Sequence, residues 1–402
     1  MKIAIIGSGI SGLGSLYYLS KKYTVDLYEV DNRLGGHTET HSIKINDKPI
    51  SVDTGFIVCN DLNYPNIINL FTELNVKLYK TSMSYSFSSP TTSWSSNDFD
   101  NWKSIFKPSK LKLLYNIIKF NKCAKNNNDL TLNLKDWLYK YRFSDKFINS
   151  YVLPMAGAIW SSDTSNILNF PASTFLNFFK NHGLLKLTKR PQWFSISNGS
   201  KSYIDKIISN SSINNLYLSS QINIERENNK IIIFYKDHKY YYDKIIFACH
   251  ANQIENILKD ISMAEKEALD LFDYNENRVV LHTDQSLMPD SKENWTAWNS
   301  YNDKDSDYVT YWMNELQDLN IDKNIFVTLG KFKQLESNSI IKNLSYEHIS
   351  YSFRTLDGQE KINRIQGLKN TYYTGAHLGY GFHEDGLTSA LNVFNIIENE
   401  QI

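Results

Sequence analysis

The stretch KIAIIGSGISGLGSLYYLSKKYTVDLYEV, residues 2–30, decides the fold. It begins with KIAII, a short β-branched apolar run that is typical of a buried parallel strand. The pattern G-x-G-x-x-G follows at once, and residues 10–21 then have the apolar spacing of a helix. A second predicted strand, residues 24–30, brings in Glu29 near its end. The order of strand, glycine turn, helix, strand and acid predicts a dinucleotide-binding unit.

Each part of this unit has a physical role in holding a dinucleotide. The first glycine permits a tight turn, the second lets the backbone approach a pyrophosphate, and the third allows close packing of helix on strand. The helix N-terminus offers free N–H groups to the phosphates, and the acid accepts hydrogen bonds from a ribose. A glycine-rich turn in an unrelated α/β protein is the alternative, but it leaves the acid unexplained. The predicted contacts are Gly7, Gly9, Ile10, Ser11, Gly12 and Glu29.

A second glycine pair follows directly in DNRLGGHT, residues 31–38. It suggests more backbone lying along an extended ligand, which a nicotinamide enzyme does not usually need. The R-x-G-G run resembles that of the flavin-containing amine oxidase and phytoene desaturase superfamily, in which this stretch lines the FAD pyrophosphate. In that superfamily an arginine often follows the glycine pair, whereas here a titratable imidazole stands there. The resemblance implies FAD contacts at Arg33, Gly35, Gly36, His37 and Thr38.

His37, Glu39 and His41 form an H-x-E-x-H run that could be mistaken for a zinc site. The zinc-protease pattern is H-E-x-x-H on a helix, whereas this threonine-rich run after Gly-Gly predicts a strand. The three side chains would share one face of that strand. Because the third ligand of a zinc site is missing, we predict no metal site and a strand beside the flavin.

The resemblance extends along the whole chain. It is narrower for a bacterial branch of NAD/FAD-binding proteins that are often encoded beside cyclopropane fatty acid synthases. Segments that match this branch include AGAIWSS (156–162), RPQWFSISNGS (190–200), IIFACHAN (245–252) and TGAHLGYGFHEDGL (374–387). The resemblance implies an α/β, two-domain flavin amine-oxidase-like fold. A discontinuous Rossmann-type FAD-binding domain would cover 1–80, 195–260 and 355–402, with an inserted, mostly helical and β substrate domain over 81–194 and 261–354.

Three further segments supply predicted cofactor contacts. A glycine interrupts the apolar segment VDTGFI (52–57), which marks either a close approach to a ligand or a plain bulge. Strands return over 222–250 around an Asn228-Asn229 hairpin turn. After a closing strand over 371–374, the last helix would begin at 386 with its N–H groups facing the flavin. The contacts predicted here are Gly55, Phe56, Ile222, Gly375, Ala376, Gly386 and Leu387.

Four titratable side chains are candidates for the catalytic role. They are His348, His377, His383 and Glu384, with Tyr351 as a polar partner. Acid–base chemistry needs such groups near the substrate, although each could instead be a satisfied structural polar group. His250, at a strand end, could contact the cofactor through its backbone alone.

The middle of the chain, residues 60–200, loses the strand–helix alternation and reads mostly as helices and loops. Segments 154–185 and 190–207 are rich in aromatic residues, as in an apolar pocket for a long substrate or in a plain core. The segment 102–125 carries seven lysines and no acid, and Leu111, Leu114, Tyr115 and Ile118 fall at helical spacing. This composition is typical of an interfacial helix, so we expect contact with a membrane surface; an ordinary surface helix is the alternative.

Overall composition narrows the function classes. The formal net charge is zero, which argues against a nucleic-acid partner. Cys59, Cys123 and Cys249 form no disulfide framework, which suggests a reducing compartment. We therefore expect a cytoplasmic protein, peripheral on the inner face of the membrane if 102–125 binds there.

The function expected from these features is an FAD-dependent oxidoreductase that takes a hydride from a C–H bond of a hydrophobic substrate. Desaturation of a fatty acyl lipid, modified or not, fits the aromatic segments and the basic helix. A flavin amine oxidase and a non-catalytic FAD-binding partner subunit are the alternatives.

Overall fold

A five-stranded parallel sheet carries the glycine-rich unit in the computed structural model, which describes residues 1–402 except 101–106, 128, 161–163, 187–190 and 401–402. The predicted strand, helix and strand are confirmed within two residues at their ends. The strand order is β10 (Ile213–Tyr217), β2 (Thr24–Tyr28), β1 (Lys2–Ile6), β14 (Lys244–Phe247) and β20 (Thr371–Tyr373).

Two helices from opposite ends of the chain pack on this sheet. They are α1 (Ile10–Leu19) and α16 (His383–Asn399), and they lie side by side. A Cβ built on Gly14 of α1 would lie 2.6 Å from Leu387 Cδ1, so this glycine sets how closely the two helices approach. Leu13, Leu16 and Leu387 are fully buried between helices and sheet. The start of the last helix, α16, is thereby placed against the first helix, α1.

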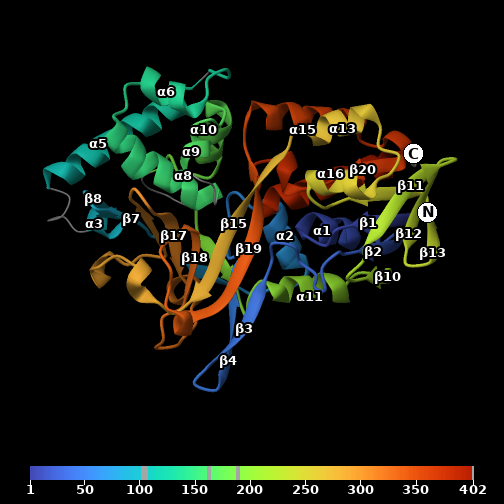
Figure 1. The fold of residues 1–402 in the computed structure, drawn as a ribbon, viewed down its shortest axis with the longest axis horizontal. Coiled ribbons are helices and arrows are strands. Elements are labelled where there is room, and N and C mark those ends of the chain that lie inside the picture. Colours follow the sequence, from blue (N-terminus) through green and yellow to red (C-terminus); the bar gives the residue numbers. More distant parts are fainter. Residues whose placement is uncertain (101–106, 128, 161–163, 187–190, 401–402) are drawn as a thin grey trace.

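A seven-stranded sheet forms the centre of the molecule (Figure 1). Its order is β19 (Ile340–Ser350), β15 (Asp273–His282), β18 (Phe326–Lys331), β17 (Asp307–Trp312), β16 (Trp298–Asn302), β7 (Tyr85–Ser89) and β8 (Thr92–Ser95). The pairing is antiparallel except between β16 and β7. The expectation of mostly helices and loops over 60–200 was wrong for β7 and β8, because β7 pairs with the distant strand β16 and β8 with β7. It also missed β6 (Leu78–Thr81) and β9 (Trp193–Ile196), which pair with each other.

A unit of helices lies at the end of the molecule opposite the parallel sheet (Figure 1). It consists of α5 (Pro108–Lys125), α6 (Leu134–Lys140), α7 (Asp145–Phe147), the π-helical turn η1 (Ile148–Val152), α8 (Leu153–Trp160), α9 (Thr164–Ile167) and α10 (Ala172–Asn181). Its interior is aromatic. The rings of Phe120, Trp137, Phe143, Phe147 and Phe179 contact one another there and are almost fully buried.

Three smaller sheets complete the fold. The antiparallel strands β11 (Ile222–Glu227), β12 (Lys230–Tyr235) and β13 (His238–Tyr242) include the predicted Asn228-Asn229 turn, in which both residues have positive φ. The hairpin β3 (Thr40–Ile45) and β4 (Lys48–Asp53) extends at the bottom of Figure 1. The third sheet has the order β5 (Val58–Asn60), β9 (Trp193–Ile196), β6 (Leu78–Thr81).

Several of the remaining helices pack on other helices: α2 on α16, α11 on α1 and α13 on α15. The α-helices are α2 (Pro65–Glu73), α3 (Asn97–Asp100), α11 (Lys201–Ser209), α12 (Ala251–Ile257), α13 (Met263–Leu269), α14 (Met313–Gln317) and α15 (Phe353–Ile365). The short 3-10 turns are η2 (Gln285–Leu287), η3 (Lys292–Asn294), η4 (Ser337–Ser339), η5 (Leu368–Asn370) and η6 (Ala376–Leu378).

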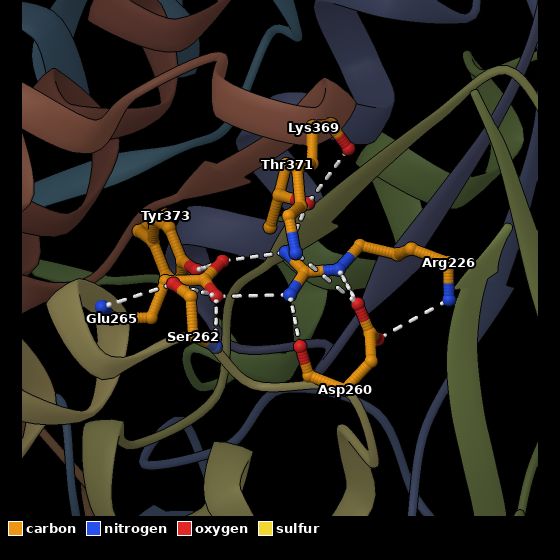
Figure 2. A network of polar contacts seen from close by, with 7 residues as sticks. All are labelled: Arg226, Asp260, Ser262, Glu265, Lys369, Thr371 and Tyr373. Carbon is orange, nitrogen blue, oxygen red and sulfur yellow. Dashed lines mark hydrogen bonds and ion pairs between the residues drawn. The ribbon is translucent and has the colours of Figure 1, made fainter. Parts of the chain in front are cut away.

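A buried arginine fixes the β11–β12–β13 sheet to the parallel sheet and to α13 (Figure 2). Arg226 of β11 donates to Glu265 and to Asp260, with 2.9 Å from Nη2 to Glu265 Oε2 and from Nε to Asp260 Oδ2. Its Nη1 also donates to Thr371 of β20, and the Tyr373 hydroxyl donates to Glu265. These hydrogen bonds lower the pKa of Glu265 to about 2 despite its burial. Breaking a buried pair of this kind by removing one partner is costly.

Three predicted element boundaries were wrong in ways that affect the site. Residues 37–39 lie in a turn and its exit, and β3 begins only at Thr40. The segment 52–57 is not one strand, because β4 ends at Asp53 and β5 begins at Val58. The last helix begins at His383, three residues before the predicted start at 386.

Two further findings concern the cysteines and the length of the helices. Cys59, Cys123 and Cys249 are free thiols. Across the described part of the chain, none of the helices combines the length and the apolarity needed to cross a bilayer.

Candidate dinucleotide and substrate site

The glycine-rich turn after β1 leaves an open space at the N-terminus of α1. Gly7 has φ +101°, and a Cβ there would lie 2.8 Å from the Ala248 carbonyl oxygen. A Cβ on Gly12 would lie only 1.9 Å from the Gly7 carbonyl oxygen, so the strand and the helix can pack this closely only with glycine. In contrast, a Cβ on Gly9 would meet no atom within 4 Å. Gly9 thus faces the space that a ligand backbone would fill.

The second glycine pair lies directly on this turn. The Gly35 N–H donates to the Ser8 carbonyl oxygen at 3.0 Å. A Cβ on Gly36, whose φ is +55°, would lie 3.0 Å from Gly9 Cα. The two glycine patterns, predicted separately from the sequence, are therefore adjacent in space.

Glu29 closes the other side of the turn and is 6% exposed. Its carboxylate accepts hydrogen bonds from the Ser8 N–H at 2.8 Å and from the Asp31 N–H at 2.9 Å. Its carbonyl oxygen accepts from the Ser220 N–H at 2.8 Å, which brings the start of β11 and Ile222 to this end of the site. Oε2 also accepts from the Ser8 hydroxyl, whereas Oε1 accepts only from the Asp31 N–H among these contacts. Oε1 therefore keeps acceptor capacity, as hydrogen bonding to a ribose requires.

The third segment is the start of α16. A Cβ on Gly386 would lie 2.7 Å from Ile10 Cγ2 and 2.9 Å from Ser11 Oγ, so the N-termini of α16 and α1 meet at this glycine. The Gly375 N–H donates to Ser389 Oγ at 2.9 Å, which holds the turn containing Ala376 against α16. The side chain of Leu387 packs on α1 rather than toward the opening.

Two residues at the start of α16, both predicted as catalytic, have structural contacts. His383 stacks on Phe56, with ring centroids 3.8 Å apart, and its Nε2 lies 2.9 Å from Thr38 Oγ1. Glu384 accepts hydrogen bonds from the Asn66 and Ile67 N–H groups at 2.9 and 3.0 Å, at the start of α2. These contacts do not support an acid–base role for Glu384, whose carboxylate stabilises a helix N-terminus. His383 instead holds Thr38 and Phe56 in place.

His377 is also enclosed by protein. It is 5% exposed, and its ring lies edge-on to Phe272 with centroids 4.9 Å apart. Burial lowers the pKa of His377 to about 3, so the ring is neutral. The neighbouring Tyr351 donates its hydroxyl hydrogen to the Gly379 carbonyl oxygen and so fixes the same loop.

Three imidazoles meet where the parallel sheet faces the seven-stranded sheet. The ring of His37 lies 5.2 Å from that of His348 on β19 and 5.6 Å from that of His250 after β14. Asn277 Nδ2 lies 3.0 Å from His348 Nδ1. Burial lowers the pKa of His348 to about 4 and the pKa of His37 well below its usual range. We call His37, His250 and His348 the imidazole cluster; its rings are neutral near pH 7.

The H-x-E-x-H run is split between two places. His41 Nε2 lies 3.5 Å from Glu39 Oε1, and Arg33 donates to Glu39 Oε2 at 2.9 Å. His37 turns away into the imidazole cluster. A Cβ on Gly55 would lie 1.7 Å from the His37 carbonyl oxygen, so this glycine lets one backbone segment approach another. In the described ranges no three His, Cys, Asp or Glu side chains are grouped as a metal would need.

An aromatic cluster borders the start of α16. Phe382 stacks on Phe178 of α10 with ring centroids 4.7 Å apart, and Trp160 of α8 lies 4.5 Å from Phe178. The Trp160 indole N–H donates to the Tyr380 carbonyl oxygen at 3.3 Å. The aromatic segments of the helical unit thus face the loop TGAHLGYGFHEDGL. Residues 161–163 of the aromatic segment 154–185 lie outside the described residues.

Several residues of this region were not predicted from the sequence. Asp385 caps α16 by accepting from the Phe382 N–H at 2.9 Å, and burial raises its pKa to about 6. Tyr274 stacks on His250 at 4.5 Å, and Asn277 pairs with Tyr346 across β15 and β19. Tyr346 and His348 are two residues apart on β19, so their side chains share one face of the strand. This spacing could have predicted that both side chains face the site.

The arrangement fits a dinucleotide. The first N–H groups of α1 have no partner within the helix, two glycine turns leave room beside them, and an acid lies at the nucleotide end. The imidazole cluster and the aromatic cluster come from other elements and lie beyond the glycine turns. A ligand as long as a dinucleotide could therefore extend from Glu29 toward these clusters.

Comparisons with known proteins agree with this geometry. A family model described as an NAD(P)-binding Rossmann-like domain matches residues 5–74. No curated protein sequence matches the chain.

Among solved structures, a CLA-producing fatty acid isomerase from P. acnes has TM-score 0.71 and 15% identity over 98% of both chains. Putrescine oxidase bound to putrescine has TM-score 0.73 and 12% identity over 99% of both chains. Cyclohexylamine oxidase from Brevibacterium oxydans IH-35A has TM-score 0.71 and 11% identity over 99% of both chains. The predicted α/β, flavin amine-oxidase-like fold is confirmed. At these sequence identities the similarity concerns the fold alone.

Proposed function

We propose that this protein is an FAD-dependent oxidoreductase that removes a hydride from a C–H bond of an acyl lipid. The observation that carries the proposal is the meeting of three glycine-containing segments around the N-terminus of α1. Gly9, Gly36 and Gly386 come from the start, the second turn and the end of the chain, and all lie at this point. A site built from three separated segments suits an elongated cofactor better than a small anion.

The chain's own residues would bind FAD in a definite order. Glu29 would accept from a ribose, and the α1 N-terminus with Ser11 would donate to the pyrophosphate. The backbone of Gly375 and Ala376 and the start of α16 would lie along the remainder. When bound, FAD supplies a hydride acceptor, and the protein supplies position and polarity.

The imidazole cluster would orient ligands rather than act as a base. If Asn277 donates to Nδ1 of the neutral His348 ring, the ring carries its own proton on Nε2 and offers a donor. Formation of a double bond removes a hydride from one carbon and a proton from its neighbour. Neutral imidazoles with a lowered pKa do not retain that proton, so it would pass to water.

The aromatic cluster favours an acyl chain over an amine. Trp160, Phe178 and Phe382 offer an apolar wall that excludes water. Asp385, the carboxylate beside this wall, accepts from the Phe382 N–H in the cap of α16. Because amine oxidases are among the similar solved structures, an amine substrate is the alternative to test.

Product analysis would test the proposed function. The FAD-loaded protein would be incubated in air with a phospholipid in detergent micelles, and the acyl chains would be measured by mass spectrometry. We expect some chains to lose two hydrogens. An unchanged lipid together with an aldehyde formed from putrescine, or a ketone formed from cyclohexylamine, would favour the amine oxidase instead. Phe178→Ala, a truncation in the apolar wall, is the matched variant and should lower turnover without removing the flavin.

A further inference from the structure

Helix α5 has apolar side chains on two faces, and only one of them packs on the protein. Ile117, Phe120 and Ala124 are buried against the rest of the helical unit. Leu111, Tyr115 and Ile118, by contrast, are 43%, 68% and 47% exposed. Spacings of four and three residues align these three side chains along the outward face. The apolar row predicted from the sequence is thus additional to the core-facing side of the helix.

The charges around this outward row have one sign. The chain has no Asp or Glu between residues 101 and 128. Lys110 is engaged with Asp98, and Lys119 donates to the Tyr141 carbonyl oxygen at 2.8 Å. Lys112, Lys122 and Lys125 remain exposed, and no salt bridge holds them among the described residues. A solvated surface helix usually mixes charges, whereas this face combines apolar side chains with lysines alone.

We propose that the outward face of α5 docks on a bilayer surface that contains anionic lipids. The occupant follows from charge complementarity, because lysines next to an anionic surface gain electrostatic free energy. The exposed apolar row enters the boundary between headgroups and acyl chains, as in interfacial helices. Residues 102–106 of the predicted contact segment lie outside the described residues, so the docking face is defined here by Leu111, Lys112, Tyr115, Ile118, Lys122 and Lys125.

The position of α5 makes this docking useful to the proposed chemistry but independent of it. The helix lies at the outer edge of the helical unit, away from the parallel sheet (Figure 1). On its inner side Phe120 contacts Phe179 of α10, with ring centroids 6.1 Å apart, and the neighbouring Phe178 belongs to the aromatic cluster. Helix α5 therefore carries the docking face on its outer side and contacts α10, which contributes to the proposed apolar wall, on its inner side. Membrane binding itself needs no flavin turnover.

Vesicle flotation with the full chain would test the docking face. Wild-type protein should float with vesicles of phosphatidylglycerol and phosphatidylcholine, and much less with phosphatidylcholine alone. The variant K112Q/K122Q/K125Q should lower the partition coefficient on the anionic vesicles about 100-fold, since each lysine contributes about five-fold. The variant L111N/Y115N/I118N should lower it about ten-fold or more through loss of apolar burial.

Met263 and Leu368 provide a matched control, because they are 72% and 57% exposed on other elements. The variant M263Q/L368N should float like the wild type. Equal flotation of all variants, or none of the wild type, would overturn the proposal. So would a wild-type dimer in sedimentation velocity that L111N/Y115N/I118N converts to a monomer without any vesicle binding. A protein that floats as expected but leaves every lipid unchanged would contradict the proposed reaction and not the docking.

Discussion

The imidazole rings of His37 and His348 lie 5.2 Å apart, although one follows the glycine pair of the nucleotide-binding unit and the other lies on β19 of the central sheet. The contact joins the two sheets where the proposed cofactor would pass from one to the other. A hydrogen bond between the Tyr346 and Thr54 hydroxyl groups, with 2.7 Å between their oxygens, lies close by. The junction between the sheets is therefore polar, neutral and partly buried.

Replacement of His348 by glutamine tests the role of the imidazole cluster. We expect flavin affinity to be unchanged and flavin reduction to slow about ten-fold, the effect of one lost hydrogen bond. Because burial lowers the pKa of His348 to about 4, the wild-type rate should show no ionisation of this group between pH 6 and 8. Stopped-flow reduction across this range is the measurement. A step near pH 6.5 that disappears in His348→Gln would show that the imidazole is a titrating base.

Glu29→Gln tests the nucleotide end of the site. The Ser8 and Asp31 N–H groups donate to different carboxylate oxygens, so the substitution keeps an acceptor for one of them and removes the charge that would hold a ribose. Hydrogen bonds to charged groups contribute about 1.5–3 kcal/mol, so FAD affinity should fall about 10- to 100-fold. Fluorescence titration of the apoprotein with FAD measures this. Thr72→Ser, a change on the exposed side of α2, is the control and should bind FAD like the wild type. Unchanged affinity in Glu29→Gln would place the ribose elsewhere.

Arg226→Met tests the network of Figure 2. It leaves Glu265 buried without its cation, so the free energy of unfolding should fall by about 3–5 kcal/mol. Urea denaturation followed by circular dichroism gives this value. The double variant R226M/E265Q should recover part of the loss, because the buried Glu265 carboxylate is then replaced by a neutral amide, while Asp260 is partly exposed and keeps Lys369 at 3.7 Å. A double variant less stable than Arg226→Met would show that the hydrogen bonds to Ser262 and Tyr373 matter more than the charge.

Buried histidines predict acid sensitivity. Burial lowers the pKa of His383 to about 3, while the unfolded chain titrates near 6.5. The unfolded state therefore binds more protons between these values, and stability falls as the pH drops from 6.5. The same sign holds for four other imidazoles whose pKa desolvation lowers: His182, His282, His348 and His377.

Asp53 and Asp385 oppose this trend, since burial raises their pKa to about 6 and the folded state then binds the extra protons. The imidazoles with a lowered pKa outnumber the carboxyls with a raised pKa, even with Glu384 included, so the midpoint of urea unfolding should be lower at pH 5 than at pH 7. His383→Gln should make the dependence shallower by up to about 1.4 kcal/mol per pH unit. An unchanged slope in this variant would show that His383 already titrates normally in the folded protein.

Local patterns predicted the nucleotide-binding unit well. The run KIAII, the glycine turn and Glu29 are close in sequence, so propensity and spacing alone fix β1, α1 and β2. The second glycine pair was also placed correctly beside the first. The hairpin at Asn228-Asn229 followed from turn chemistry, and both residues have positive φ.

Contacts between residues far apart in the chain could not be predicted from the sequence. His383 and Glu384 are polar neighbours in a glycine-rich loop, which resembles a reactive cluster. Their partners, Phe56 and the start of α2, become visible only when α16 packs on α1. Strand β7 was missed for the same reason, because a short strand is defined by its partner and β16 lies about two hundred residues later. Strand β8 was missed with it, because it pairs with β7. The sequence predicted the helical spacing of Leu111, Tyr115 and Ile118 on α5, but it could not predict that this row faces away from the protein.

Anaerobic reduction of the FAD-loaded protein tests the central claim most directly. Under anaerobic conditions the bound flavin would be mixed with an acyl phospholipid in micelles, and its visible absorbance followed. The account predicts bleaching by the lipid, no bleaching by putrescine or cyclohexylamine, and slower bleaching in Phe178→Ala. A flavin that binds but keeps its absorbance with every lipid would contradict the account.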